Sequence, residues 1–139
     1  MGNFSKKQKM AIRQRAKGRC EYCQTPANYA PSPFPNEHIN PTSKGGLDKL
    51  DNIAFACNGC NWFKSNKTEI FDAQTKLKVP LFNPRQQKWK KHFNWTTDKL
   101  RIIALTPIGA VTIETLKLNR DGLINLRFAL MAIGIHPPE

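Results

Sequence analysis

The sequence lacks any apolar stretch long enough to cross a bilayer, and its N-terminus lacks the apolar core of a signal peptide. Acidic residues are also scarce: 10 Asp and Glu stand against 22 Lys and Arg, and none precedes Glu21. The absence of a membrane-spanning stretch and of a signal-peptide core argues against a membrane or exported protein, and we expect a cytoplasmic one. The formal charge of +12 on 139 residues favours a polyanionic partner, nucleic acid or an anionic membrane surface, over a merely soluble basic protein.

Only four cysteines are present, as two Cys-x-x-Cys pairs, Cys20 with Cys23 and Cys57 with Cys60. Each pair can form a tight knuckle that presents two thiolates, and two knuckles complete a tetrahedral zinc site. In a reducing compartment an even cysteine number indicates metal rather than disulfides. Redox or disulfide-bonded cysteines are the alternative, but a thioredoxin-like pair needs a βαβ context that the sequence lacks. We expect a closed structural Zn²⁺ site, which leaves no coordination position for water.

Caps and breakers predict an α+β fold in a single domain, 1–139. Ser5 and Gly18 bound a first helix, and Thr106 and Asp121 start two later ones. We expect helices at 5–17, 61–67, 107–118 and 122–133, strands at 37–39, 52–56 and 100–105, a proline-rich loop at 24–36, and less regular structure at 70–98. The domain then consists of a basic helix (1–19), a zinc-stapled core (20–68) and a C-terminal extension (69–139).

The first predicted helix is strongly basic and contains no acid to pair with its cations. Unpaired like charges on a helix cost stability, so a phosphate backbone is a good candidate for what favours them. A solvated surface is the alternative interpretation. The residues that we expect to contact nucleic acid are Lys6, Lys7, Arg13, Lys44, Lys64, Arg85 and Lys88.

Between the knuckles, Glu37 and His38 place a carboxylate beside an imidazole. Adjacent side chains of an extended segment point to opposite faces, which suggests Glu37 on a metal and His38 toward a water. Histidine titrates near neutral pH and suits the role of general base. Asn61 follows the second knuckle and offers an amide oxygen, and such oxygen ligands favour Mg²⁺ or Mn²⁺. Taken singly, these residues also suit a surface pair and a helix cap.

The order and spacing of these residues resemble the HNH endonuclease superfamily and its ββα-metal motif. The matching segments are Arg19-Cys20-Glu21-Tyr22-Cys23, Glu37-His38-Ile39-x-Pro41, Gly45-Gly46, Asp51-Asn52-Ile53 and Cys57-x-x-Cys60-Asn61-x-x-Lys64. Further segments from Pro80 to Pro138 are similar to small, uncharacterised bacterial HNH proteins. These include Pro80-Leu81-Phe82-Asn83-Pro84-Arg85, Trp89-x-x-His92-Phe93-x-Trp95 and His136-Pro137-Pro138.

The resemblance implies a metal-dependent endonuclease that hydrolyses DNA and leaves 5′-phosphate and 3′-hydroxyl ends. It implies His38 as general base and Glu37 and Asn61 as ligands of a catalytic divalent ion, Mg²⁺ or another such as Mn²⁺ or Ni²⁺. It also implies that Asn52 supports catalysis structurally, by tying down the loop so that His38 keeps its orientation. Many relatives carry His where this chain has Asn61, and a neutral amide is the weaker ligand.

The segment 85–101 combines cations with three aromatic residues, Trp89, Phe93 and Trp95. Aromatics among cations can stack on exposed bases. We favour instead that they anchor the segment on the core, with Trp89 and Phe93 on one helix face, while the cations serve nucleic acid. We expect His92 to be packed or hydrogen-bonded. Helical spacing indicates core positions at Ile113, Leu116, Leu126, Ala129, Leu130 and Ile133.

Two other functions fit the sequence. One is a zinc-stapled nucleic-acid-binding module without turnover, and the other is a nuclease subunit of a toxin or restriction system that needs a partner. Glu37, His38 and Asn61 favour the enzyme, because binding alone needs none of them. We expect double-stranded DNA as substrate and no membrane partner. Nicking or double-strand cleavage, and monomer or homodimer, stay open.

Overall fold

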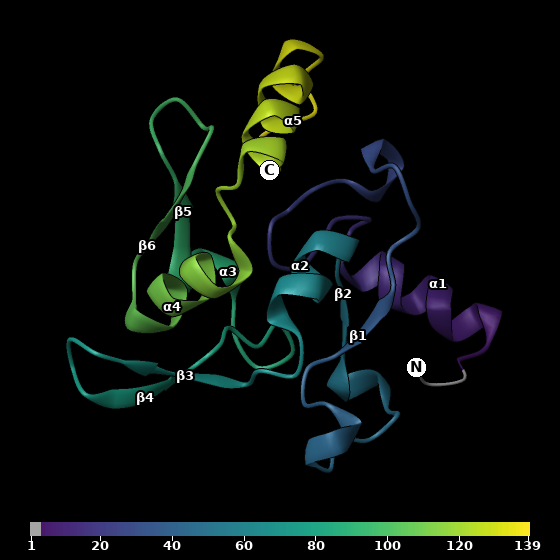
Figure 1. The fold of residues 1–139 in the computed structure, drawn as a ribbon. Coiled ribbons are helices and arrows are strands. Elements are labelled where there is room, and N and C mark those ends of the chain that lie inside the picture. The colour runs from purple at the N-terminus through teal and green to yellow at the C-terminus, as the bar shows by residue number, and fades with distance from the viewer. Residues whose placement is uncertain (1–3) are drawn as a thin grey trace.

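The computed structural model describes residues 4–139, so the first three residues of the predicted basic segment lie outside it. Its helices are α1 (Lys6–Arg15), α2 (Asn58–Lys64), α3 (Trp89–His92), α4 (Pro107–Leu116) and α5 (Asp121–Ala132). Its strands pair as antiparallel ribbons, β1 (Asn36–His38) with β2 (Ile53–Phe55), β3 (Glu69–Asp72) with β4 (Leu77–Pro80), and β5 (Phe93–Trp95) with β6 (Ile102–Ala104) (Figure 1). The α+β class is confirmed. Within the described chain, no helix combines the length and apolar character needed to cross a membrane.

The β1–β2 ribbon separates two apolar clusters. Glu37 is opposite Ala54 in the register, and His38 is opposite Ile53. Because side chains alternate along a strand, the first pair shares one face and the second pair the other. Ala54 packs in the main cluster with the cysteines, whereas Ile53 and Phe55 pack with Ile12 of α1. The ribbon therefore directs Glu37 toward α2 and His38 toward the opposite side.

Helix α1 begins where Ser5 predicts it. The Ser5 side chain accepts from the Gln8 backbone N–H, and the Gln8 side chain accepts from the Ser5 backbone N–H, forming a capping box. Past the helix, Gly18 has a φ of +70°, a left-handed conformation that glycine adopts without steric cost. Ile12 is the buried residue of the helix, and the Arg15 guanidinium donates to the Ile53 carbonyl. These contacts fix α1 on β2 and leave its lysines exposed.

The segment 70–98 is more regular than the sequence predicts. It contains most of the β3–β4 hairpin, helix α3 and strand β5. Pro80 suggests a break but closes β4, opposite Glu69. A proline at the end of an edge strand needs no ladder donor, so it is compatible with the hairpin. The strands β3 and β4 also have only four residues each, and β3 places Ile70 beside Phe71, so little apolar alternation was available to indicate them.

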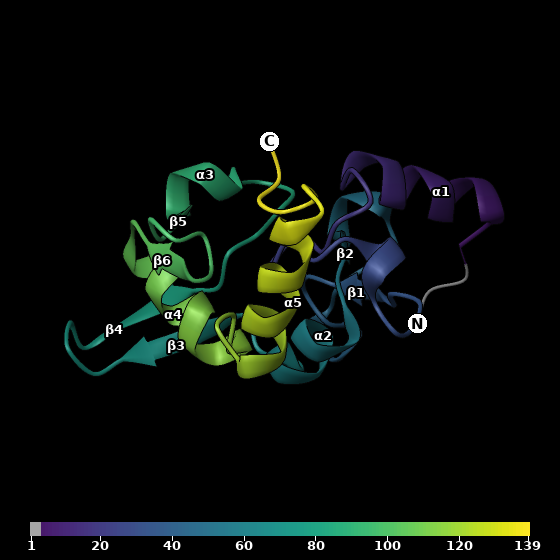
Figure 2. The ribbon, with the colours of Figure 1, turned by 90° about the horizontal axis from the view of Figure 1, so that it is seen from above.

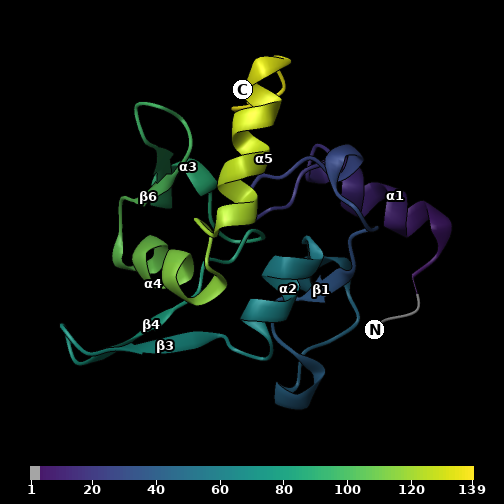
Figure 3. The same ribbon diagram turned by 45° about the horizontal axis from the view of Figure 1, so that its top comes forward.

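Helix α5 lies between the β1–β2/α2 unit and the C-terminal ribbons (Figures 2 and 3). Its Arg127 is buried, donates to the carbonyls of Leu118 at 2.7 Å and Leu100 at 3.1 Å, and lies 5.1 Å from the Trp95 ring centroid. The predicted core positions are confirmed at Leu116 and Leu130, but Ile133 is 59% exposed. Ala129 is also exposed, because the buried face of α5 runs through Leu123, Arg127 and Leu130.

The expectation that the C-terminal aromatics anchor the chain is confirmed. Phe93 is buried, Trp89 packs against the same cluster, and the Trp89 Nε1–H donates to the Tyr22 carbonyl at 2.9 Å. Trp89 and Phe93 do not share a helix face, since α3 ends at His92 and Phe93 begins β5. The His92 Nδ1 lies 2.7 Å from the Thr106 hydroxyl, so this histidine is hydrogen-bonded as expected.

Candidate active site

The four cysteines converge. Their sulfur atoms all lie within 4.8 Å of one another, and all four side chains are buried free thiols. In each knuckle the backbone N–H of the second cysteine donates to the sulfur of the first, at 3.4 Å for both Cys23 and Cys60. Four thiolates at this spacing fit tetrahedral zinc, whose bonds to sulfur are about 2.3 Å long. The cluster is therefore compatible with a closed zinc site.

Arg120 contributes positive charge to the cluster from the C-terminal extension. Its guanidinium nitrogens lie 3.6 Å from the Cys57 sulfur and 3.8 Å from that of Cys60. Hydrogen bonds among the neighbouring sulfurs lower the pKa of the Cys57 thiol, whereas burial raises the pKa of the Cys20 thiol. A Cβ on Gly59 would lie 2.4 Å from the Arg120 Nη2, so glycine leaves room for this contact. The extension thus supplies a counter-charge to the thiolates.

Glu37 faces α2 and pairs with Lys64. The Lys64 ammonium lies 3.1 Å from the Glu37 Oε1 and also donates to the carbonyls of His38 at 3.3 Å and Ile39 at 3.1 Å. Lys64 is 1% exposed and Glu37 7%. Burial raises the pKa of the Glu37 carboxyl and lowers that of the Lys64 amine, and their attraction opposes both shifts. The pair ties the end of β1 to α2 and gives Glu37 a counter-charge.

His38 faces the loop that joins β1 to β2. Its Nε2 lies 2.6 Å from the Oδ1 of Asp48, and its side chain is 12% exposed. The sequence interpretation missed Asp48, which follows the Gly45-Gly46 pair by two residues. Those glycines could have indicated a close backbone approach, because a Cβ on Gly46 would lie only 1.8 Å from the Asn40 carbonyl oxygen. The loop therefore packs close against the end of β1, which brings Asp48 to His38.

Asn52 bridges the two sides of this loop. Its Oδ1 accepts from the Asn40 N–H at 2.9 Å, and its Nδ2 donates to the carbonyls of Asn40 at 3.0 Å and Leu47 at 2.9 Å. Leu47 directly precedes Asp48, so Asn52 holds the backbone that carries the partner of His38. These contacts agree with the structural role that the resemblance implies for Asn52.

Asn61 lies in α2, one turn before Lys64, and is half-buried. Residues three apart on a helix share a face, so Asn61 lies on the side that meets Glu37. Within residues 4–139, the Asn61 amide has no hydrogen-bond partner, and Lys64 is the only donor to the Glu37 carboxylate. One carboxylate oxygen and one amide oxygen are thus available for a hard cation, which is a donor set suited to Mg²⁺.

Two of the residues expected to contact nucleic acid need correction. Lys64 is buried against Glu37, and Arg85 forms a part-buried ion pair with Glu21. Each cation faces an internal carboxylate, so neither presents its charge to a phosphate. The other expected contact residues lie at exposed positions, on α1 (Lys6, Lys7 and Arg13), in the turn at 42–44 (Lys44) and before α3 (Lys88).

The ribbon and the following helix form a ββα unit beside a four-cysteine cluster that is compatible with zinc. Residues 20–75 match the family model described as HNH endonuclease. The matched segment holds both knuckles, β1, β2 and α2, so the resemblance to the HNH superfamily is confirmed there. HNH endonucleases act on nucleic acid with a divalent metal, so the match suggests nuclease activity for the segment that it covers. No curated protein and no solved structure shows significant similarity to the chain.

Proposed function

We propose that this protein is a metal-dependent endonuclease that hydrolyses phosphodiester bonds of double-stranded DNA, with His38 as general base. The contact between His38 and Asp48 carries the proposal. An ionised carboxylate only accepts hydrogen bonds, so Nε2 of a neutral His38 holds the proton and donates it. The lone pair of the neutral ring then lies on Nδ1, which is the atom that would take a proton from water.

Glu37 and Asn61 are the residues that would hold the divalent ion, Mg²⁺ or another such as Mn²⁺ or Ni²⁺. When bound, such an ion supplies positive charge that stabilises the phosphate and the leaving 3′ oxygen. Lys64 already neutralises part of the Glu37 charge, and Asn61 is neutral, so these two residues would bind a cation weakly. We therefore expect activity to depend on millimolar rather than micromolar metal.

His38 and Glu37 act from opposite faces of β1. The outer edge of β1 carries no strand partner within the described chain, since β2 is its neighbour. A phosphodiester across that edge would approach His38 on one side and Glu37 on the other. Proton uptake by His38 and charge stabilisation at Glu37 and Asn61 would then act on one phosphate, leaving 5′-phosphate and 3′-hydroxyl ends.

Replacement of Asp48 by asparagine is expected to lower kcat for DNA cleavage by about 10- to 100-fold, the range typical of lost orienting partners. The asparagine amide can turn its nitrogen toward Nε2, where it does not accept a hydrogen bond. The imidazole of His38 then loses its fixed orientation. Asp48 is 56% exposed at its side chain, so the melting temperature and KM should stay unchanged. Steady-state cleavage and thermal melts test this, with Asp51→Asn as the control. An equal loss of kcat in Asp51→Asn would contradict the proposed role of Asp48 in orienting His38.

The experiment that tests the proposed function is a metal titration of plasmid cleavage. Wild type, Asn61→Ala and Asn61→Asp are compared in Mg²⁺, with Asn66→Ala as an exposed control. Alanine should raise the half-saturating metal concentration, whereas aspartate adds a charged ligand and should lower it. Cleavage that ignores the metal, or identical curves for all variants, would contradict the assignment of Asn61.

A non-catalytic DNA-binding module is the second candidate. The observation that favours it is the Lys64 ammonium on Glu37, because a fixed cation can take the place that a metal would need. This candidate predicts DNA binding without cleavage in Mg²⁺, Mn²⁺ or Ni²⁺. The same titration therefore decides between the two.

A further inference from the structure

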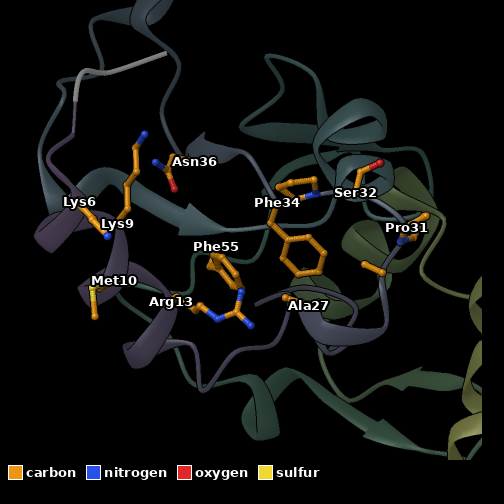
Figure 4. A pocket seen from close by; sticks show the side chains of 12 residues that line it. Lys6, Lys9, Met10, Arg13, Ala27, Pro31, Ser32, Phe34, Asn36 and Phe55 are labelled. Atoms are coloured by element: carbon orange, nitrogen blue, oxygen red, sulfur yellow. The ribbon is translucent and has the colours of Figure 1, made fainter.

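A groove lies between α1 and the 27–36 segment, on the side of the β1–β2 ribbon away from α2 (Figure 4). Its volume is about 660 Å³, within the usual range of small-ligand pockets. Phe34 and Phe55 form its inner wall, with ring centroids 4.9 Å apart. Pro31 and Ala27 extend this apolar surface. We call this hollow the α1 groove.

Cations line the outer side of the α1 groove. Lys6, Lys9 and Arg13 lie on one face of α1, at spacings of three and four residues. Lys7, which is equally exposed, does not line the groove. Across residues 4–139, no carboxylate lies within ion-pair distance of these cations. The Arg13 guanidinium instead lies 5.9 Å from the Phe55 centroid and donates to the Asn28 Oδ1 at 2.7 Å.

This combination suits a ligand with an anionic part and a flat apolar part. A simple anion would gain nothing from Phe34 and Phe55, and a neutral apolar ligand would gain nothing from the lysines. A nucleotide has both parts, with phosphate for the cations and a base for the aromatic wall. Asn36 also lines the groove and lies two residues before His38 on the same ribbon face, about 7 Å along the strand. The groove therefore opens beside the proposed catalytic base.

We propose that the α1 groove binds an unpaired base of the DNA strand next to the phosphate that is cut, with Lys6 and Lys9 on the flanking phosphates. This inference rests on the proposed function, because it assumes that DNA lies across β1. It predicts that, within double-stranded DNA, the protein prefers sites with a bulged, flipped or unpaired nucleotide near the cleavage position. Fully paired DNA would leave the groove empty and bind less tightly.

Binding in the His38→Ala background tests the groove apart from cleavage. Affinity is measured without added divalent ion and without chelator, so that the DNA stays intact and zinc is not removed. The probes are two duplexes that differ only at one bulged nucleotide, which is either intact or abasic. The intact bulge should bind roughly 5- to 150-fold more tightly, the range for stacking of one base. Ala30→Trp or Ser32→Trp, each filling the groove, should abolish that preference, whereas Tyr29→Trp outside the groove should keep it.

The lysines give a second, independent readout. Lys9→Gln should reduce the slope of log affinity against log salt by about 0.9 on duplex DNA, the change expected for one lost phosphate contact. Lys78→Gln is the control, because this exposed lysine of β4 lies outside the groove, and it should leave the slope nearly unchanged. Equal affinity for intact and abasic bulges, or equal salt slopes for the two variants, would contradict base binding in the α1 groove. This holds even if the wild-type protein cuts plasmid. The protein could instead bind phosphatidylglycerol vesicles, more weakly in Lys9→Gln, and show no preference for the intact bulge. That result would contradict base binding and indicate that the groove binds a lipid surface.

Discussion

Replacement of Cys57 by serine is expected to unfold the protein at room temperature. A four-cysteine zinc site supplies about 10–16 kcal/mol of apparent binding energy, as large as the whole stability of a typical domain. Here the four sulfurs belong to the main buried cluster, together with Tyr22, Phe82 and Leu116. Removing one ligand should therefore separate the first knuckle, α2 and the C-terminal extension, which meet at this cluster. Circular dichroism and thermal melts should show loss of the cooperative transition.

The matched control is Thr25→Val. The Thr25 hydroxyl lies 3.2 Å from the Cys23 sulfur, so this variant changes the surroundings of the cluster but keeps all four thiolates. It should stay folded and, like wild type, hold about one zinc ion per chain by metal analysis. A Cys57→Ser protein that melts like wild type would contradict the zinc staple. So would wild-type protein that contains disulfides and no zinc.

The features that the sequence predicted well are those set by local signals. The Cys-x-x-Cys spacing fixes each knuckle, and Ser5, Thr106 and Gly18 mark helix ends through caps and a left-handed turn. The short strands β1 and β2 follow from extended segments on either side of a glycine-containing loop. These signals act within a few residues, so one sequence is enough to interpret them. They located the segment that the family model matches.

Partners that are distant in sequence could not be predicted. Lys64 was expected at the surface, but α2 turns it onto Glu37, 27 positions earlier. Arg85 pairs with Glu21 across 64 positions. A lysine or arginine looks the same in sequence whether it is solvated or paired inside, and only the packing of α2 and β1 distinguishes the two. The Asp48 partner of His38 was missed for the same reason, although the adjacent glycines indicated a close approach.

Strand β6 lies within the strand predicted at 100–105, but the β3–β4 hairpin and β5 were missed for another physical reason. Strand assignment depends on alternation of apolar and polar residues over several positions, and β3 and β4 have only four residues each, with two adjacent apolar residues in β3. The helix α5 was found, but its buried face was placed wrongly, since Arg127 takes a core position through carbonyl contacts. A buried arginine breaks the apolar periodicity from which the core is inferred.

Replacement of His38 by alanine is expected to lower the cleavage rate by about 10²–10⁴-fold, the usual contribution of a general base. The imidazole meets Asp48, an exposed loop residue, and no ion pair of the core depends on it. The fold, the zinc content and the affinity for DNA should therefore persist. His92→Ala is the matched control, because His92 hydrogen-bonds Thr106 in the C-terminal half and has no part in the proposed chemistry.

Cleavage of supercoiled plasmid by wild type, His38→Ala and His92→Ala, in Mg²⁺, Mn²⁺ or Ni²⁺, tests whether the protein is a nuclease with His38 as its general base. Gel analysis at matched protein and zinc content should show nicked or linear DNA with wild type and His92→Ala. His38→Ala should leave the plasmid supercoiled over the same period. Equal cleavage by wild type and His38→Ala would exclude His38 as the general base, and binding by all three proteins without cleavage in any metal would exclude a nuclease.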